Sequence, residues 1–151
     1  MKLLKLFRPD RLSFKDVRNF LSGIPCINQG GCDIAAYAMY LWLKKHKKLN
    51  KKFKFVLGYR SYCEDAYINN QNVLRSKNGI AEAPNHMFIY YDDKYMDCDE
   101  YVDEKSYRFI QYVDEEWFIK NCVSNINSWN FEFDRKKYIP IIEKKLGIKL
   151  S

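Results

Sequence analysis

The stretch that decides the fold runs from Asn28 to His46 and reads NQGGCDIAAYAMYLWLKKH. Its apolar residues recur at helical spacing, and its closing lysines suit the negative end of a helix dipole. We therefore expect a helix over about residues 32–46 that begins at Cys32. At the first position of a helix, unpaired backbone N–H groups and the positive dipole end favour a thiolate over a thiol.

Two simpler interpretations of this stretch remain open. A free cysteine often packs as a small buried hydrophobe, and a glycine pair before a helix often forms only a tight turn. Residues 28–46 alone therefore do not distinguish a nucleophilic from a structural cysteine. The rest of the chain has to supply the partners of a nucleophile.

The composition is typical of one globular domain rather than of a disordered or membrane protein. The chain has 151 residues, of which 47% are hydrophobic and 30% charged. Aromatic residues make up 17%, which favours strands and a well-packed interior. We expect a single domain over residues 1–151.

The N-terminus predicts no export signal. The apolar run of residues 1–7 is interrupted by Lys5 and is too short for the core of a secretion signal, and no stretch is long enough to cross a bilayer. We expect a cytoplasmic protein without membrane association, in which cysteines are thiols rather than disulfides. The chain has five of them, at positions 26, 32, 63, 98 and 122.

The net charge of +7 admits a nucleic-acid partner without favouring one. The positive charges gather at residues 44–54 and 135–149, and such clusters are usually solvated faces. A metal site is also disfavoured, because the chain has no Cys-x-x-Cys pair and no histidine-rich cluster. We expect neither a metal nor a cofactor.

The remaining elements predict an α+β fold with an antiparallel sheet packed on the central helix. Ser13 and Asp16 resemble a capping box and predict a short helix before Gly23. Pro25 predicts an extended approach to the glycine pair. Further along we expect a strand over 51–58, a long loop over 59–84, a strand over 106–113, a helix after Asp114 and a strand over 129–133. A last helix ends at Gly147. It starts at Asp134 or, as we prefer, at Pro140.

The clearest hairpin spans residues 85–99 and reads NHMFIYYDDKYMDCD. With a loop of two or four residues, the numbers of opposite residues add up to 185, so that His86 faces Asp99 and Phe88 faces Asp97. Because side chains alternate, His86 and both aspartates then share one face. Asp97 is the diagonal neighbour of His86, roughly 7–8 Å away between backbones. A three-residue loop would reverse this parity.

These residues predict a catalytic triad. A thiolate needs a base that holds its proton, and the base needs a third group that orients it. Cys32, His86 and Asp97 supply the three in chain order. Asp99 is the alternative acid; we prefer Asp97, because it follows an apolar part of the strand, where burial strengthens its pull on an imidazole.

An oxyanion formed at Cys32 also needs hydrogen-bond donors. The backbone N–H of Cys32 at the helix start is one candidate. The side-chain amide of Gln29 or of Asn28 is the other.

Three motifs in this order, GGCDIAA leading a helix, NHMFIY on a strand and KYMD on the next strand, carry a family resemblance over about residues 24–99. The chain resembles the papain-like and transglutaminase-like superfamily, particularly its small bacterial and phage members. The resemblance implies N-terminal helices with the nucleophile helix packed on an antiparallel sheet, and the roles of nucleophile for Cys32, base for His86 and acid for Asp97. The chain departs from many members at Asp33, whose charge beside the thiol opposes thiolate formation.

We therefore expect a cysteine-dependent acyl-transfer enzyme that acts on amide bonds of a peptide or protein substrate through a thioester. Peptidase (thiol protease), amidase, deamidase and transglutaminase activities all remain open, because loops rather than the triad select the acceptor. The alternative is a non-catalytic basic protein of the same fold that contacts nucleic acid or a host protein.

Overall fold

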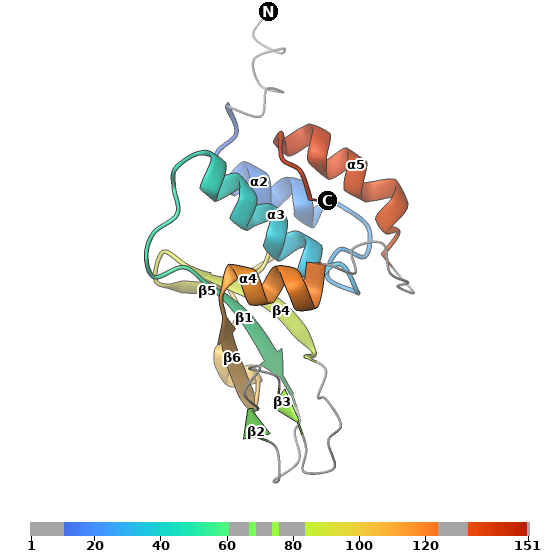
Figure 1. Cartoon of the computed structure of the whole chain (residues 1–151). Coiled ribbons are helices and arrows are strands. Elements are labelled where there is room, and N and C mark those ends of the chain that lie inside the picture. The colour runs from blue at the N-terminus through green and yellow to red at the C-terminus, as the bar shows by residue number, and fades with distance from the viewer. Residues whose placement is uncertain (1–10, 61–66, 69–73, 76–83, 124–132, 151) are drawn as a thin grey trace, which may run out of the picture.

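The computed structural model describes residues 11–60, 67–68, 74–75, 84–123 and 133–150. Within these ranges the protein is α+β, with helices gathered on one side of an antiparallel sheet (Figure 1). Most of the predicted loop over 59–84 and of the predicted strand over 129–133 lies outside the described residues, as does Cys63.

Helix α2 (Phe14–Ser22) begins as its sequence predicts. The Ser13 hydroxyl accepts a hydrogen bond from the Asp16 N–H at 3.1 Å, and the Asp16 carboxylate accepts one from the Ser13 N–H at 2.9 Å. This capping box satisfies two backbone donors that the helix start leaves unpaired, and Gly23 ends the helix.

The segment between the first two helices is a series of turns, so the predicted extended approach is wrong. The Ile27 N–H donates to the Ile24 carbonyl at 3.3 Å, and the Gln29 N–H donates to the Cys26 carbonyl at 3.0 Å. Cys26 and Gly30 have φ angles of 61° and 116°. Pro25 restricts its own φ and the residue before it, but not Cys26, which adopts a left-handed conformation.

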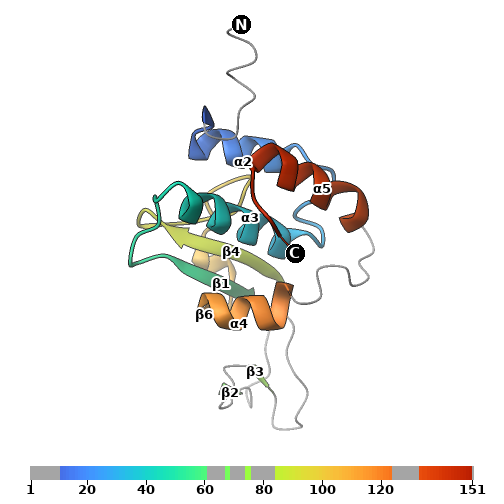
Figure 2. The same ribbon diagram turned by 45° about the horizontal axis from the view of Figure 1, so that its top comes forward.

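Helix α3 (Cys32–Lys45) confirms the predicted central helix to within one residue. It is buried on almost every side, with Met39, Trp42 and Leu43 fully shielded from solvent. Figure 2 shows why: α3 lies between the sheet and the helices α2 and α5.

The main sheet is antiparallel throughout, in the order β5-β4-β1-β6. Its residues Phe55, Leu57 and Ile89 belong to the same hydrophobic cluster as α3. A separate two-stranded sheet joins β2 and β3. The strands are β1 (Lys54–Tyr59), β2 (Tyr67–Ile68), β3 (Leu74–Arg75), β4 (His86–Tyr91), β5 (Lys94–Met96) and β6 (Phe109–Val113).

The hairpin register is confirmed. Tyr90 pairs with Tyr95 and Ile89 with Met96, as the two-residue loop requires. Strand β5 ends at Met96, however, and the chain turns at once, with the Asp97 N–H donating to the Glu100 carbonyl at 3.1 Å. The aspartates of the predicted register therefore lie in a turn, and the expected pairing of His86 with Asp99 does not form.

The C-terminal helices start at aspartate caps. Asp114 caps α4 (Glu115–Phe118), which runs on into the π-helical turn η3 (Ile119–Val123), and Asp134 caps α5 (Arg135–Leu146). Our preference for a start at Pro140 is wrong: Pro140 lies inside α5, which ends at Gly147 with a φ of 64°. A short 3-10 helix, η2 (Glu104–Ser106), precedes β6.

A single hydrophobic cluster joins these elements. Phe118 of α4 stacks on Phe55 of β1 with ring centroids 4.1 Å apart, and Val17 of α2 and Ile142 of α5 are fully buried. Among the described residues, no helix has both the length and the apolar character needed to span a bilayer.

Candidate active site

Cys32 is the first residue of α3, with Gly31 as its N-cap. Its backbone N–H is one of those that a helix start leaves without an intrahelical acceptor, and its side chain is half-buried. Cys32 therefore lies at the positive end of the helix dipole, in a position that stabilises negative charge on a nearby atom.

His86 and Asp97 are joined directly. The His86 Nε2 lies 2.9 Å from the Asp97 Oδ2, and the two side chains are 12% and 9% exposed. The backbone N–H groups of Asp99 and Glu100 each donate to the other carboxylate oxygen of Asp97 at 2.8 Å. Asp97 is thus held by three donors, and its ionised carboxylate accepts a hydrogen bond from the Nε2–H of His86.

The charges of this pair reinforce each other. Burial acts to raise the pKa of Asp97, but the bonds from His86 and from the two backbone N–H groups outweigh it and place the pKa below its ordinary value. Burial likewise acts to lower the pKa of His86, but its contacts with Asp97 and Cys32 outweigh burial and raise it to about 9. Imidazolium and carboxylate are therefore the favoured forms at neutral pH.

Cys32 is the other residue that acts on His86: together with Asp97 it raises the pKa of the imidazole. Because Nε2 is occupied by Asp97, Nδ1 is the ring nitrogen left for the thiol. The structure thus binds His86 to Asp97 and places Cys32 where it acts on the pKa of His86.

Asp99 and Asn28 line the same polar pocket as His86 and Asp97, but their side chains bind each other. Asp99 is exposed, and its carboxylate accepts a hydrogen bond from the Asn28 side-chain amide. The Asn28 amide oxygen also faces the Cys98 thiol at 3.9 Å. Asp99 is therefore drawn toward Asn28 rather than toward His86, and the Asn28 side chain is committed to this turn instead of to an oxyanion at Cys32.

Of the donors expected for an oxyanion, Gln29 and the Cys32 N–H remain. Gln29 is exposed, and its own backbone N–H is bound by Cys26. Gln29 therefore lies at the surface, three residues before the start of α3.

Asp33, the acidic residue beside Cys32, is neutralised by Arg135. The two form a buried ion pair with N–O distances of 3.1–3.2 Å, and their side chains are 8% and 10% exposed. Arg135 also donates to the Gly30 carbonyl at 3.0 Å. Burial raises the pKa of Asp33, and the guanidinium opposes that shift. The Asp33 charge is thus compensated and does not stand alone beside the thiol.

Sequence reasoning missed Arg135. The Asp134 cap signal locates Arg135 at a helix start, but no local signal predicts a partner 102 residues away. The ring of Phe133, two residues before Arg135, packs directly against Gly31. A Cβ atom on Gly31 would lie only 2.8 Å from this ring. Together Phe133 and Arg135 fasten the turn that leads into Cys32.

Tyr107 and Arg60 were also missed. The Tyr107 ring lies over Gly58, where a Cβ atom would come within 2.7 Å of it, and stacks on Phe88 at 5.5 Å between centroids. Burial raises the pKa of Tyr107; Arg60 lowers it, and the nearby Asp97 and Cys32 raise it further. Tyr107 and Arg60 help to line a polar pocket of about 400 Å³ that reaches His86 and Asp97. Only the tertiary fold places them there.

The other described cysteines differ from Cys32. Cys98 is 2% exposed, and burial, together with Asp99 and Asp97, raises the pKa of its thiol to about 12. Cys26 is half-buried in the turn before α3. Within the described ranges, no three histidine, cysteine or acidic side chains cluster closely enough to hold a metal ion.

No family model, curated protein or solved structure matches this chain.

Proposed function

We propose that the protein is a cysteine-dependent acyl-transfer enzyme with a papain-like or transglutaminase-like fold, acting on amide bonds of a peptide or protein. The observation that carries the proposal is the bond between His86 and Asp97, with Cys32 at a helix start and acting on the pKa of His86. Nucleophile, base and orienting acid are the minimum set for thiol catalysis.

In the first half of the reaction, the Cys32 thiolate attacks the carbonyl carbon of the substrate amide. A carbon–sulfur bond forms, and the negative charge moves to the carbonyl oxygen, where the Cys32 N–H and Gln29 are the available donors. As the carbon–nitrogen bond breaks, the protonated Nδ1 of His86 gives its proton to the leaving nitrogen. A thioester on Cys32 and a neutral His86 remain.

In the second half, water or an amine attacks the thioester carbon while Nδ1 of His86 takes up its proton. The carbon–sulfur bond breaks, and the thiolate–imidazolium pair is restored. Asp97 keeps its bond to Nε2 throughout, which fixes the ring orientation and stabilises the imidazolium. Water as acceptor gives hydrolysis or deamidation, and an amine gives transamidation.

A minimal acyl donor tests this proposal without knowledge of the substrate. We expect p-nitrophenyl acetate to release nitrophenolate in a burst and to leave an acetyl group on Cys32, detected by peptide mapping. Cys32→Ser should abolish the burst, His86→Ala should reduce it strongly, and the matched variant Cys26→Ser should retain it. Acetylation of Cys26 in place of Cys32, or a burst that Cys32→Ser leaves intact, would contradict the proposal.

A separate observation supports the alternative, a basic binding protein without catalytic activity. The lysines at 44, 45, 47, 48, 51, 52 and 54 are exposed. If they bind nucleic acid, the affinity should fall steeply with salt concentration, since each neutralised phosphate releases counterions. It should also survive Cys32→Ser, whereas acyl transfer should not.

A further inference from the structure

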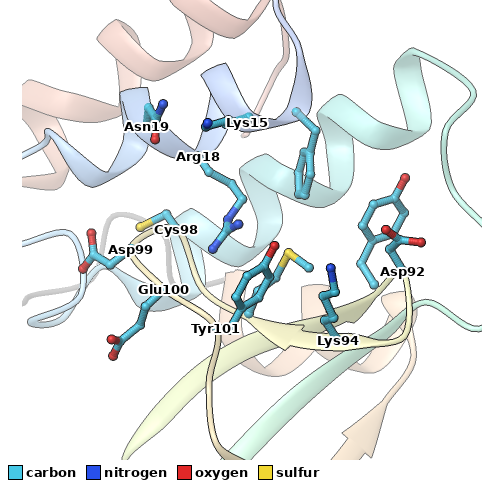
Figure 3. Close-up of a pocket in the computed structure, with 12 residues that line it drawn as sticks. Lys15, Arg18, Asn19, Asp92, Lys94, Cys98, Asp99, Glu100 and Tyr101 are labelled. Atoms are coloured by element: carbon cyan, nitrogen blue, oxygen red, sulfur yellow. The ribbon is translucent and has the colours of Figure 1, made fainter.

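A second cleft, next to the polar pocket at His86 and sharing Asp99 and Glu100 with it, lies between α2 and the β4–β5 hairpin. It has a volume of about 550 Å³, which falls in the range of small-molecule sites. Lys15 and Arg18 of α2 form one wall, and Lys94 and Tyr101 form the other (Figure 3). The triad does not use this cleft.

Two cations converge on one exposed ring inside it. The Arg18 guanidinium carbon and the Lys94 ammonium each lie 5.1 Å from the centre of the Tyr101 ring. Tyr101 is 60% exposed. Among the residues that the structure describes, neither Arg18 nor Lys94 forms an ion pair with a carboxylate. Two positive charges that lie against one ring without an ion-paired carboxylate favour an anion beside them.

Arg18 is also preorganised. Its Nε donates to the backbone carbonyl of Asp97 at 3.0 Å, which fixes the plane of the guanidinium and directs its terminal nitrogens toward the cleft. A guanidinium held in this way offers two parallel donors to a phosphate, and the ammonium of Lys94 adds a movable third donor.

The acidic residues of the lining limit where an anion can lie. Asp99 is bound by Asn28, and Figure 3 shows Asp99 and Glu100 directed away from Arg18, with Asp92 at the opposite end of the cleft, beyond Lys94. The anionic group therefore has to lie centrally, between Arg18 and Lys94. There it matches two positive charges, as a phosphate monoester does with a charge of about −1.5 to −2 at neutral pH.

The rest of the lining is apolar. Phe14 and Tyr91 pack edge to face with centroids 5.2 Å apart, and Met96 adds a buried side chain. A ligand that reaches both parts of the cleft carries an apolar body beside its charged group. We propose that this cleft is a binding site for an organic phosphate monoester whose phosphate lies between Arg18 and Lys94 and whose apolar part contacts Phe14 and Tyr91.

Calorimetric titration with phenyl phosphate, in a phosphate-free buffer at constant ionic strength, tests this site. We expect saturable binding at one site, tighter than that of inorganic phosphate, which lacks the apolar body, and tighter than that of benzoate, which carries one charge. Lys94→Gln should weaken phenyl phosphate binding by roughly tenfold, the loss expected for one charge-assisted hydrogen bond.

Lys54→Gln is the matched control, because it removes the same charge from an exposed position outside the cleft. It should change the affinity by less than a factor of two. The absence of saturable binding would overturn the site; equal effects of Lys94→Gln and Lys54→Gln would overturn its location; and benzoate binding as tight as phenyl phosphate would overturn the phosphate. None of these outcomes depends on acyl transfer by Cys32.

Discussion

Asp97 reaches His86 from a turn rather than from a strand. The two residues are 11 apart in the chain, and their side chains meet at 2.9 Å although β5 ends one residue before Asp97. Because Asp97 leaves the ladder, its carboxylate is positioned by the N–H groups of Asp99 and Glu100 and not by cross-strand pairing. The geometry of one turn therefore sets the orientation of the imidazole.

Removal of the Asp97 carboxylate should lower the pKa of His86 below its value of about 9. Asp97→Asn replaces an ionic acceptor by an amide, which no longer stabilises the imidazolium. Asp99→Asn, the matched variant in the same turn, should leave the His86 pKa nearly unchanged. An NMR titration of the imidazole protons measures both, and a larger shift in Asp99→Asn would transfer the acid role to Asp99.

Cys32 should be the first described cysteine to react with limiting iodoacetamide at neutral pH. It combines a helix N-terminus with an imidazolium neighbour, whereas burial and a pKa of about 12 keep Cys98 inert. Peptide mapping of the carboxamidomethyl groups identifies the site. His86→Ala should slow the labelling of Cys32 and leave that of Cys26 unchanged; faster labelling of Cys26 in the wild type would count against the triad.

The contribution of His86 to stability should depend on pH. Its folded-state pKa of about 9 exceeds the ordinary 6.5, so protonation stabilises the fold. This stabilisation is fully present below about pH 6.5 and is lost as the pH rises through about 9. Urea denaturation of the wild type and of His86→Gln should show a difference in unfolding free energy that shrinks over this interval. A difference that grows with pH would contradict the assignment.

Breaking the ion pair between Asp33 and Arg135 should destabilise the protein strongly. Arg135→Met leaves the Asp33 carboxylate buried without its partner, a change that typically costs about 3–5 kcal/mol. Lys52→Met removes one partner of an exposed pair whose side chains are 74% and 71% accessible, and should cost no more than about 1 kcal/mol. Chemical denaturation compares the two. Equal losses would show that the buried pair is not important for the fold.

Gly31→Ala should destabilise the turn before Cys32 by crowding alone. A Cβ atom there would lie 2.7 Å from the Ile27 carbonyl and 2.8 Å from the Phe133 ring, and overpacking of this kind costs about 1–3 kcal/mol. At Gly23 the nearest atom would be 3.5 Å away, so Gly23→Ala is the control and should be nearly neutral. Thermal unfolding of both variants measures the difference; similar melting temperatures would contradict it.

Local signals predicted the elements that depend on neighbouring residues. Ser13 and Asp16 cap α2, Cys32 begins α3, and the two-residue loop at Asp92 and Asp93 sets the hairpin register. Both loop aspartates adopt left-handed φ angles, 55° and 59°, which this residue type tolerates in a tight hairpin turn. Each of these features is complete within a few residues, so the sequence contains all of its causes.

The sequence by itself thus determined the helix start at Cys32, the strand that carries His86 and the choice of Asp97 as the acid with which to test the site. Only the tertiary structure decided that Asp99 is drawn toward Asn28, 71 residues away, that Arg18 holds the backbone of Asp97 from 79 residues away, and that Arg135 neutralises Asp33. These contacts form where separate elements pack together. Their partners are chosen by the shared shape and charge of the packed surfaces, which no local spacing encodes.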